Sequence, residues 1–387
     1  MKLSQSTPTL LAFFALILLH EPATGPSAEP GKTVGPNEMI VCPATVQNPR
    51  NSEADVELLK DGSLLMAYTE FYGGVGTDWG KARIAAKTSK DSGHTWSDSF
   101  TLVENQAQMN VMSPSLLRLK SGKLVMIYML KNSEADCRVL YLTSSNEGKT
   151  WTKPLGVTPS IRYWGMNNDR LVQLKSGRLL APLWFVDDWR KSHHTRGVVF
   201  YSDDEGQTWK AGSEVDIPQG PRGVDEPAVV ELKDGRVLMM IRSDLGKVFK
   251  SLSSDAGLSW SQPEALPLDS PTAPSSITRI PSTGHLLFIW NNSPKGPKHT
   301  QDRFPLTAAI SQDEGKTWGK IKNVDATPGF TYAYTSLTFL SPKSLLMTSR
   351  HDTHDRQAST CQAVPQTGLR TGTLLLAFGA SVNAIGV

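Results

Sequence analysis

The stretch Ser89–Trp96, with the sequence SKDSGHTW, recurs in four further copies and decides the fold of this chain. Every copy follows the pattern S-x-D/N-x-G-x-S/T-W, and the successive tryptophans are 55, 58, 51 and 58 residues apart. This period is slightly longer than a four-stranded blade of a β-propeller needs. The further copies are Ser144–Trp151, Ser202–Trp209, Ser253–Trp260 and Ser311–Trp318.

The eight residues of this box suit a hairpin corner. The Asp or Asn side chain can accept hydrogen bonds from nearby backbone N–H groups, the Gly can adopt positive φ, and the Trp can cover an apolar edge. The second copy has Asn146 where the others have Asp. A turn tolerates this exchange, whereas a metal ligand or a catalytic acid would not. We therefore expect a structural role for all five boxes and assign catalysis to none of them.

A second series of turns alternates with the boxes. Polar turn residues precede apolar runs, as in Lys60–Ala67 (KDGSLLMA), and the series has five clear members with a weaker sixth at Ser341–Met347. Each of these patterns, an apolar run on both sides of a tight turn, predicts two strands joined by that turn. Six hairpins separated by five boxes, without useful helical periodicity after the first thirty residues, predict an all-β fold, a six-bladed β-propeller.

The two ends depart from the repeat. Residues 1–28 resemble a signal peptide, because Lys2 precedes an apolar run, Leu10–Leu19, that is too short to span a bilayer, and Ala28 suits cleavage. We expect a secreted or periplasmic protein without a stable membrane anchor, with a retained anchor as the alternative. Residues 29–350 form the predicted propeller. Residues 351–387 are a divergent tail, and whether it completes the last blade stays open.

The composition limits the classes of partner and cofactor. The net charge of +3 is spread evenly, without a basic block, so we expect no nucleic-acid partner. Cys42, Cys137 and Cys361 allow at most one disulfide, and whether any forms is left open. Their spacing fits no metal site. We expect neither a metal nor another cofactor.

Chemistry on such a scaffold must come from charged residues on the inner strands and on the loops of one face. Glu226 opens one apolar strand, and Arg242 ends the next strand sixteen residues later. Arg303 precedes the strand that leads into the fifth box, and Tyr334 opens another strand.

Over roughly residues 45–350 the chain resembles the exo-sialidase (neuraminidase) family, whose propellers carry BNR or Asp-box repeats. The resemblance rests on five boxes, the Glu-x15-Arg pair, the Arg-x-x-Leu-Thr strand and a Tyr before a Ser/Thr-x-Leu-Thr strand. It implies an exo-acting, retaining glycoside hydrolase. The implied partners are glycoconjugates from which it releases terminal sialic acid or a related acidic sugar, without a cofactor.

The resemblance makes Arg242 and Arg303 two members of an arginine triad that binds the substrate carboxylate. Planar guanidinium groups suit this task, because they form paired, charge-assisted hydrogen bonds with carboxylates. The third member is Arg50, although the family's spacing falls on Ser52. A shift of two residues keeps a side chain on the same face of a strand, so Arg50 can still point inward. This departure leaves the exact sugar specificity open.

The same resemblance makes Tyr334 the nucleophile, Glu226 its base and Asp78 the acid/base. A phenol with a pKa of about 10 needs a carboxylate partner to become a good nucleophile, and sialidases are the tyrosine exception among glycosidases. Tyr332 lies on the same face of the strand and competes with Tyr334. Asp78 lies in a glycine-rich loop, where a role in a turn is the alternative.

Two further groups are candidates for substrate contacts. Asn168 precedes its turn glycine by nine residues, as Glu226 does, and Arg170 lies two residues further along the chain. If both side chains point inward, Arg170 is a candidate for an extra anion or hydroxyl contact; the alternative is a structural ion pair. Trp164 and the loop from Trp184 to His194 are candidates for a sugar-stacking rim, with simple packing as the alternative.

Two rival functions remain open at this point. A non-catalytic propeller that binds glycans or proteins outside the cell is favoured slightly by the irregular C-terminus and by the displaced Arg50. A hydrolase or lyase for another uronic-type sugar would use the same scaffold. The sequence predicts the sialidase-like hydrolase first.

Overall fold

The computed structural model describes residues 39–159, 161–293, 303–353 and 359–365, and every regular element within them is a β-strand. The predicted all-β class is confirmed. In these ranges the chain forms no helix, and so none that is long and apolar enough to cross a membrane. The predicted signal peptide, residues 1–28, and the last part of the tail, residues 366–387, lie outside the described residues.

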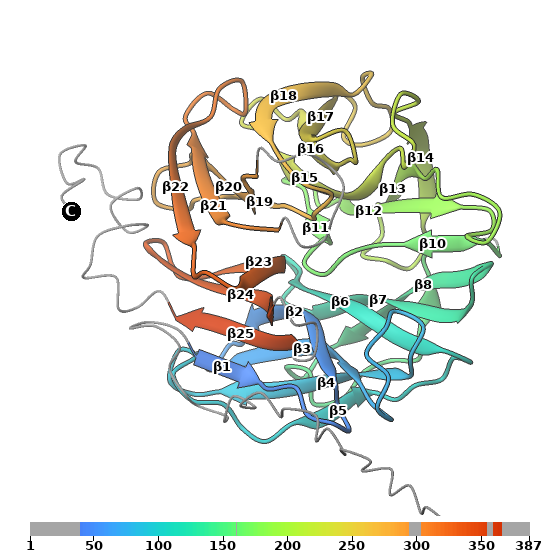
Figure 1. Cartoon of the computed structure of the whole chain (residues 1–387), viewed down its shortest axis with the longest axis vertical. Coiled ribbons are helices and arrows are strands. Elements are labelled where there is room, and N and C mark those ends of the chain that lie inside the picture. Colours follow the sequence, from blue (N-terminus) through green and yellow to red (C-terminus); the bar gives the residue numbers. More distant parts are fainter. Residues whose placement is uncertain (1–38, 160, 294–302, 354–358, 366–387) are drawn as a thin grey trace, which may run out of the picture.

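The strands form antiparallel groups that follow the chain and surround a common centre (Figure 1). The first two groups are β2 (Arg50–Leu58), β3 (Leu64–Phe71), β4 (Ala82–Ser89) and β5 (Phe100–Val103), then β6 (Asn110–Arg118), β7 (Leu124–Ser133), β8 (Asp136–Ser144) and β9 (Leu155–Gly156). The third is β10 (Tyr163–Gly165), β11 (Val172–Gln173), β12 (Leu179–Val186), β13 (Arg196–Ser202) and β14 (Lys210–Val215). The next two are β15 (Asp225–Glu231), β16 (Val237–Arg242), β17 (Lys247–Ser253) and β18 (Glu264–Asp269), then β19 (Ser276–Arg279), β20 (Leu286–Asn291), β21 (Leu306–Ser311) and β22 (Gly319–Asp325).

The last group joins the two ends of the described chain. It consists of β23 (Phe330–Ser341), β24 (Ser344–Thr353), β25 (Ser359–Pro365) and β1 (Met39–Cys42). Strand β25 pairs with β24 on one side and antiparallel with β1 on the other, with Met39 opposite Ala363 and Cys42 opposite Cys361. The divergent tail therefore contributes a strand, β25, that lies beside the first described strand.

The hydrophobic core lies between neighbouring groups. One cluster combines Leu65 and Ile84 of the first group with Met126 and Leu142 of the second. The apolar face of each group is thus removed from water by the next group, which is the main source of stability for such an arrangement.

The boxes form the predicted corners. In the third copy, Ser202 Oγ donates to Asp204 Oδ1 over 2.7 Å, and the backbone N–H of Thr208 donates to the same oxygen over 2.9 Å. These hydrogen bonds hold the pKa of Asp204 at about 2. Gly206 has φ of +86°, and its carbonyl accepts a hydrogen bond of 3.1 Å from Trp209 Nε1. The box residues serve the turn, as their pattern indicated.

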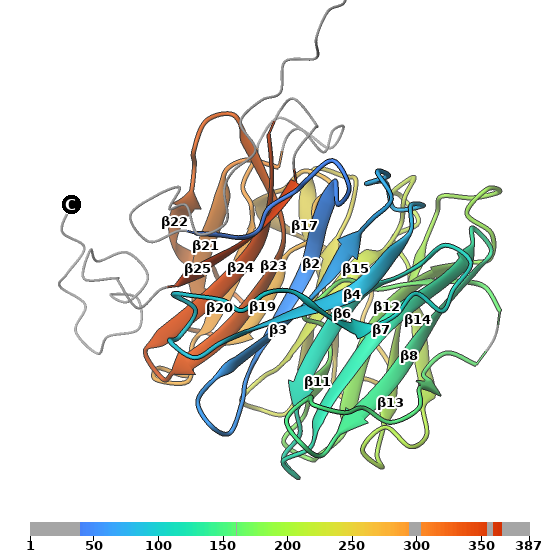
Figure 2. The same ribbon diagram turned by 90° about the horizontal axis from the view of Figure 1, so that it is seen from below.

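The first strand of most groups lies nearest the centre and carries a bulge near its start (Figure 1). At the bulge one residue adopts positive φ without being glycine, which is uncommon and marks a position where a side chain is re-aimed. The strands run between the two faces of the molecule (Figure 2), so these bulges lie toward one face. The residues concerned are Glu53, Ser113, Glu226 and Tyr334; Asp169, between β10 and β11, also has positive φ.

Candidate active site

The three arginines of the predicted triad converge on Tyr334. Arg50 begins β2, Arg242 ends β16 and Arg303 precedes β21, and their exposed fractions are 5, 8 and 6%. The Tyr334 phenol contributes to the pKa of each of them. The guanidinium carbon of Arg303 lies 5.6 Å from the centroid of the Tyr334 ring. Arginines from the first, fourth and fifth groups of strands therefore surround the phenol of Tyr334.

Glu226 and Arg242 form a buried ion pair at the bulge of β15. Glu226 Oε2 accepts a hydrogen bond of 2.5 Å from an Arg242 terminal nitrogen, and the fully buried Asp225 carboxylate lies 3.6 Å from Arg242 Nε. Burial lowers the pKa of Arg242, but the charges of Glu226 and Asp225 outweigh it and raise the pKa above its ordinary value. Arg242 therefore stays charged although it is desolvated.

Arg303 differs from Arg242 in its partners. Its terminal nitrogen donates to the Thr272 carbonyl over 3.1 Å, and Arg242 Nε donates to the Thr272 hydroxyl over 3.2 Å. Among the described residues no carboxylate lies within ion-pair distance of Arg303, and burial lowers its pKa. A buried cation without a counter-ion is costly. Arg303 is thus suited to an anion supplied by a ligand.

Asp78 lies beside the remaining arginine. The Asp78 carboxylate, whose side chain is 56% exposed, forms an ion pair with the buried Arg50 guanidinium. Arg50 also donates to Glu53 Oε1 over 2.5 Å. Desolvation by the surrounding protein raises the pKa of this half-exposed carboxyl, but the charges of Arg50 and Lys131 together hold the pKa well below its ordinary value. Asp78 is therefore ionised in this structure.

The candidates Asn168 and Arg170 lie at the centre of the molecule. Asn168 Nδ2 donates to the carbonyl oxygens of Ala54 (2.6 Å) and Tyr334 (3.1 Å), so it helps to fix the backbone of Tyr334. The Arg170 guanidinium, 2% exposed, donates to the carbonyls of Asn168 and Ser275 over 3.1 and 2.9 Å. These contacts link the third group of strands to the first, the fifth and the last through backbone oxygens.

The competitor Tyr332 has a different environment from Tyr334. Tyr332 is fully buried, and its hydroxyl donates to Asp325 Oδ1 over 2.6 Å. Burial and this bond raise the pKa of Tyr332 above its ordinary value. The Tyr332 hydroxyl is thus engaged with Asp325, whereas the Tyr334 ring lies beside Arg303 and Arg350.

The predicted aromatic rim is a packed cluster between the loop of Asp78 and the third group of strands. Tyr163 stacks on Trp184 with a centroid distance of 5.5 Å, and Trp189 lies 5.6 Å from Tyr163. Trp79, next to Asp78, lies 6.1 Å from Tyr163. Trp164, by contrast, packs against Phe185 and Phe200 in the core.

Sequence reasoning missed several charged residues of this region. Glu53 precedes its turn glycine, Gly62, by nine residues, so the spacing that links Asn168 to Glu226 would also have selected it. Arg350, on β24 opposite Ala333, places its guanidinium carbon 5.8 Å from the Tyr334 ring. The other missed residues are Asp225, Arg222 and Lys131.

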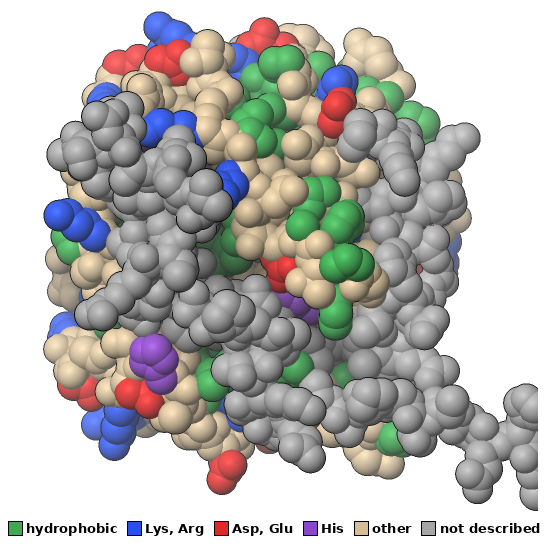
Figure 3. Space-filling view, turned by 60° about the vertical axis from the view of Figure 1, so that its left-hand side comes forward, with side chains coloured by type: hydrophobic (Ala, Val, Ile, Leu, Met, Phe, Trp, Pro, Cys, Tyr) green, Lys and Arg blue, Asp and Glu red, His purple; other side chains and the backbone are tan. Residues whose placement is uncertain are grey.

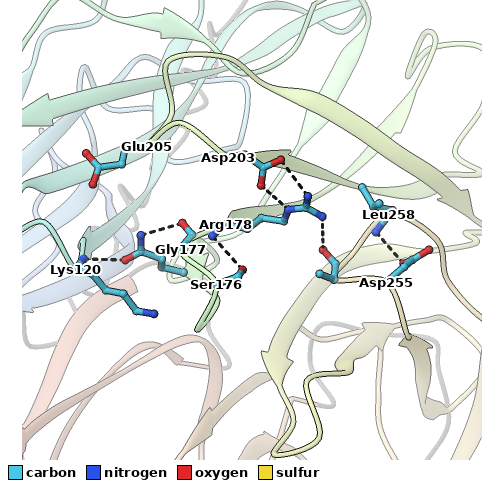
Figure 4. Close-up of a pocket in the computed structure, with 10 residues that line it drawn as sticks. Lys120, Ser176, Gly177, Arg178, Asp203, Glu205, Asp255 and Leu258 are labelled. Atoms are coloured by element: carbon cyan, nitrogen blue, oxygen red, sulfur yellow. Dashed lines mark hydrogen bonds and ion pairs between the residues drawn. The ribbon is translucent and has the colours of Figure 1, made fainter.

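A hollow elsewhere in the molecule does not contain these residues. It lies at the box corners, near the start of β12 and the end of β13, and Figure 4 shows the side chains that line it. Its arginine is already paired, because Arg178 Nε donates to Asp203 Oδ1 over 2.7 Å. The β3–β4 loop that carries Asp78 leaves the opposite ends of the strands. We assign no catalytic role to this hollow.

Charges are mixed over the surface. Figure 3 shows Lys and Arg side chains interspersed with Asp and Glu on the described part of one face. Within the described ranges no group of three or more His, Cys, Asp or Glu side chains is arranged to hold a metal ion.

The comparisons with known proteins agree with this geometry. Residues 62–344 match the BNR repeat-like domain. A sialidase of Micromonospora viridifaciens is 27% identical over 317 residues, which cover 72% of this chain and 46% of that protein. A sialidase of Bacteroides fragilis is 23% identical over 214 residues, 52% of this chain and 37% of that protein. The chain thus spans less than half the length of either relative.

Solved structures show the same fold. The Hadza microbial sialidase Hz136 has a TM-score of 0.69 at 18% identity, covering 85% of this chain and 68% of that one. The Trypanosoma rangeli sialidase in its covalent intermediate with 2,3-difluorosialic acid has a TM-score of 0.67 at 20% identity, covering 87% and 56%. The all-β architecture is therefore that of the sialidase β-propellers. With more than half of its length matched, the chain belongs to the BNR repeat-like domain family.

Proposed function

We propose that the protein is an exo-acting, retaining glycoside hydrolase that releases terminal sialic acid, or a related acidic sugar, from glycoconjugates. The observation that carries this proposal is the convergence of three buried arginines on one phenol, with carboxylates beside them. Sialic acid carries an ionised carboxylate on its reacting carbon. A cluster of guanidinium groups beside a nucleophile fits that arrangement of charges.

Arg303 supplies the energetic reason for choosing an anionic sugar. In the described ranges this desolvated guanidinium has no carboxylate partner, which destabilises the free protein, and a bound carboxylate offsets that cost. Charge-assisted hydrogen bonds of this kind contribute about 1.5–3 kcal/mol each. A neutral sugar would leave this cation uncompensated.

In the first step the Tyr334 oxygen attacks the anomeric carbon, while the bond from that carbon to the leaving oxygen breaks. Glu226 accepts the phenolic proton, and Asp78 donates a proton to the leaving oxygen. The neutral phenol approaches an anionic sugar without the repulsion that a carboxylate nucleophile would experience. This step leaves the sugar covalently attached to Tyr334, the type of intermediate that the Trypanosoma rangeli sialidase structure is named for.

In the second step Asp78 removes a proton from water, and the water oxygen attacks the anomeric carbon. The bond between this carbon and Tyr334 breaks, and the phenolate recovers its proton from Glu226. Two successive displacements on one carbon retain its configuration.

Substrate binding also prepares Asp78 for its role as an acid. In the structure Asp78 is ionised because it pairs with Arg50. A substrate carboxylate that binds Arg50 neutralises this guanidinium, so Asp78 loses part of its stabilisation as an anion and can take up the proton that it later donates.

The proposal includes the architecture and location of the protein. The six groups of strands are proposed to be six propeller blades, with the last one completed by β25 and β1. The apolar segment Leu10–Leu19 after Lys2 supports action outside the cytoplasm.

The test is hydrolysis of sialyllactose by the full chain, followed by proton NMR. The proposal predicts release of free sialic acid with the α-anomer appearing first. Initial appearance of the β-anomer would contradict the retaining mechanism. Measurable binding without turnover would identify a non-catalytic propeller, and release only from uronosyl substrates would identify a different sugar class.

A further inference from the structure

Lys131, on β7, is a buried cation beneath the loop that carries Asp78. Its side chain is 1% exposed, and its ammonium group donates to the backbone carbonyl oxygen of Asp78 over 2.9 Å. The same nitrogen lies 4.7 Å from the Trp79 ring centroid and 5.5 Å from that of Tyr163. Among the described residues no carboxylate lies within ion-pair distance of it.

Asn110 lies opposite Lys131 in the pairing of β6 with β7 and binds the same loop. Its fully buried side-chain amide donates to the carbonyl oxygens of Asp78 (3.0 Å) and Gly80 (2.8 Å). The loop itself is tightly folded, because a Cβ atom on Gly80 would lie 2.4 Å from the Val75 carbonyl oxygen. Two neighbouring side chains thus converge on one backbone oxygen of the loop.

Burial of an ammonium group without a carboxylate partner is expensive, and Lys131 has no such partner in the described part of the chain; burial lowers its pKa. A methionine would fill a similar volume without this cost. The cation instead contacts the Asp78 carbonyl oxygen, the Met112 sulfur and two aromatic faces, and the ring faces attract a cation. These contacts act on Asp78 and Trp79, the residues that carry the predicted acid and its neighbouring ring.

We infer that Lys131, together with Asn110, is a positioning residue that fixes the Asp78 loop so that the Asp78 carboxyl group can reach the leaving oxygen of the substrate. The inference rests on the proposed function for its catalytic consequence. Lys131 does not touch the substrate, since it is buried behind Trp79 and Tyr163. It acts through the backbone of Asp78.

The test uses two substrates that differ in their need for an acid. The leaving alcohol of sialyllactose requires protonation, whereas the acidic phenol of 4-methylumbelliferyl sialoside requires little. We expect Lys131→Met to lower kcat/KM for sialyllactose by about 100-fold, the cost of a misplaced catalytic group, and for the aryl sialoside by less than about threefold. Asp78→Asn should show the same selectivity.

A second readout does not depend on activity. Hydrogen exchange at the amides of Tyr72, Gly74 and Gly80, which hydrogen-bond within or beside the loop, should become faster in Lys131→Met and in Asn110→Ala. The control Lys87→Met removes a lysine on the neighbouring β4 whose ammonium donates to the Ser97 carbonyl. It should change neither readout.

Equal losses on the two substrates would overturn the positioning role. Unchanged loop exchange in both variants would overturn the inference as well. If the unmodified protein hydrolyses neither substrate, the proposed function fails, whereas faster loop exchange in the variants would still support fixation of the loop by Lys131. Should Lys131→Met not fold, Asn110→Ala decides through the same two measurements.

Discussion

The Asp78 carboxylate is paired with the Arg50 guanidinium. The predicted catalytic acid therefore neutralises one of the arginines that are predicted to bind the substrate carboxylate. Arg50 has a second carboxylate partner in Glu53, which is buried with it. A substrate carboxylate can therefore replace Asp78 at Arg50 while Glu53 keeps the guanidinium in place. In the proposed mechanism this arrangement would couple binding of an acidic sugar to release of Asp78 from Arg50.

Replacement of Arg50 tests this coupling. Arg50→Gln removes charge-assisted bonds worth about 1.5–3 kcal/mol, so kcat/KM for sialyllactose should fall about 10- to 150-fold. The matched control is Arg83→Gln, which removes an arginine paired with Glu70 on the same group of strands and should change kcat/KM less than about twofold. Full activity of Arg50→Gln would exclude Arg50 from carboxylate binding.

Tyr332 and Tyr334 should separate stability from catalysis. Tyr332→Phe removes the hydroxyl that donates to Asp325, a bond to a carboxylate worth about 1.5–3 kcal/mol. Thermal unfolding should therefore shift down by several degrees, while kcat of the folded variant on the aryl sialoside stays unchanged. A Tyr332→Phe protein with normal Tm and no turnover would reverse the assignment of the two tyrosines.

The box glycine Gly206 and the turn glycine Gly177 of the alternating series offer a comparison that tests the box corner. Gly206 and Gly177 both have positive φ, but a Cβ atom on Gly206 would lie 2.3 Å from the Tyr141 ring, whereas nothing lies within 4 Å of one on Gly177. Gly177→Ala should cost about 1–2 kcal/mol of unfolding free energy, and Gly206→Ala should cost at least about 1–3 kcal/mol more. Urea unfolding of both variants measures the difference, and equal costs would argue against the corner geometry.

A buried histidine should make stability depend on pH. Burial lowers the pKa of His351 to about 4, although the charge of Asp325 acts in the opposite direction. In the unfolded chain a histidine binds a proton below pH of about 6.5, so the unfolding free energy should fall as the pH decreases from about 6.5 toward 4. His351→Gln cannot titrate, and its Tm should drop less between pH 7 and pH 5. An unchanged drop would show that other groups cause the pH dependence.

The fold could be predicted because its signals are local and repeated. The boxes and turns each fix a corner with a few neighbouring residues, and the hydrogen bonds around Asp204 show how. The pairing of β25 with β1 could not be predicted in the same way. It joins segments about three hundred residues apart, and neither has a box or turn glycine that would set its register.

The site was predictable to the extent that sequence spacing reflects the repeat. Arg50, despite its shift of two residues, lies with Arg242 and Arg303 around Tyr334. Lys131 could not be found, because a lysine at the end of an apolar strand usually reaches solvent. Its burial arises only when the Asp78 loop folds over it, and that contact crosses from one group of strands to the next. The catalytic roles themselves stay predictions.

The most direct test of the account is covalent trapping with 2,3-difluorosialic acid, read by intact mass and peptide mass spectrometry. The account predicts one adduct per molecule, attached to Tyr334 and absent from Tyr334→Phe, with Tyr332→Phe still labelled. An adduct on any other residue, or normal turnover of sialyllactose by Tyr334→Phe, would contradict it.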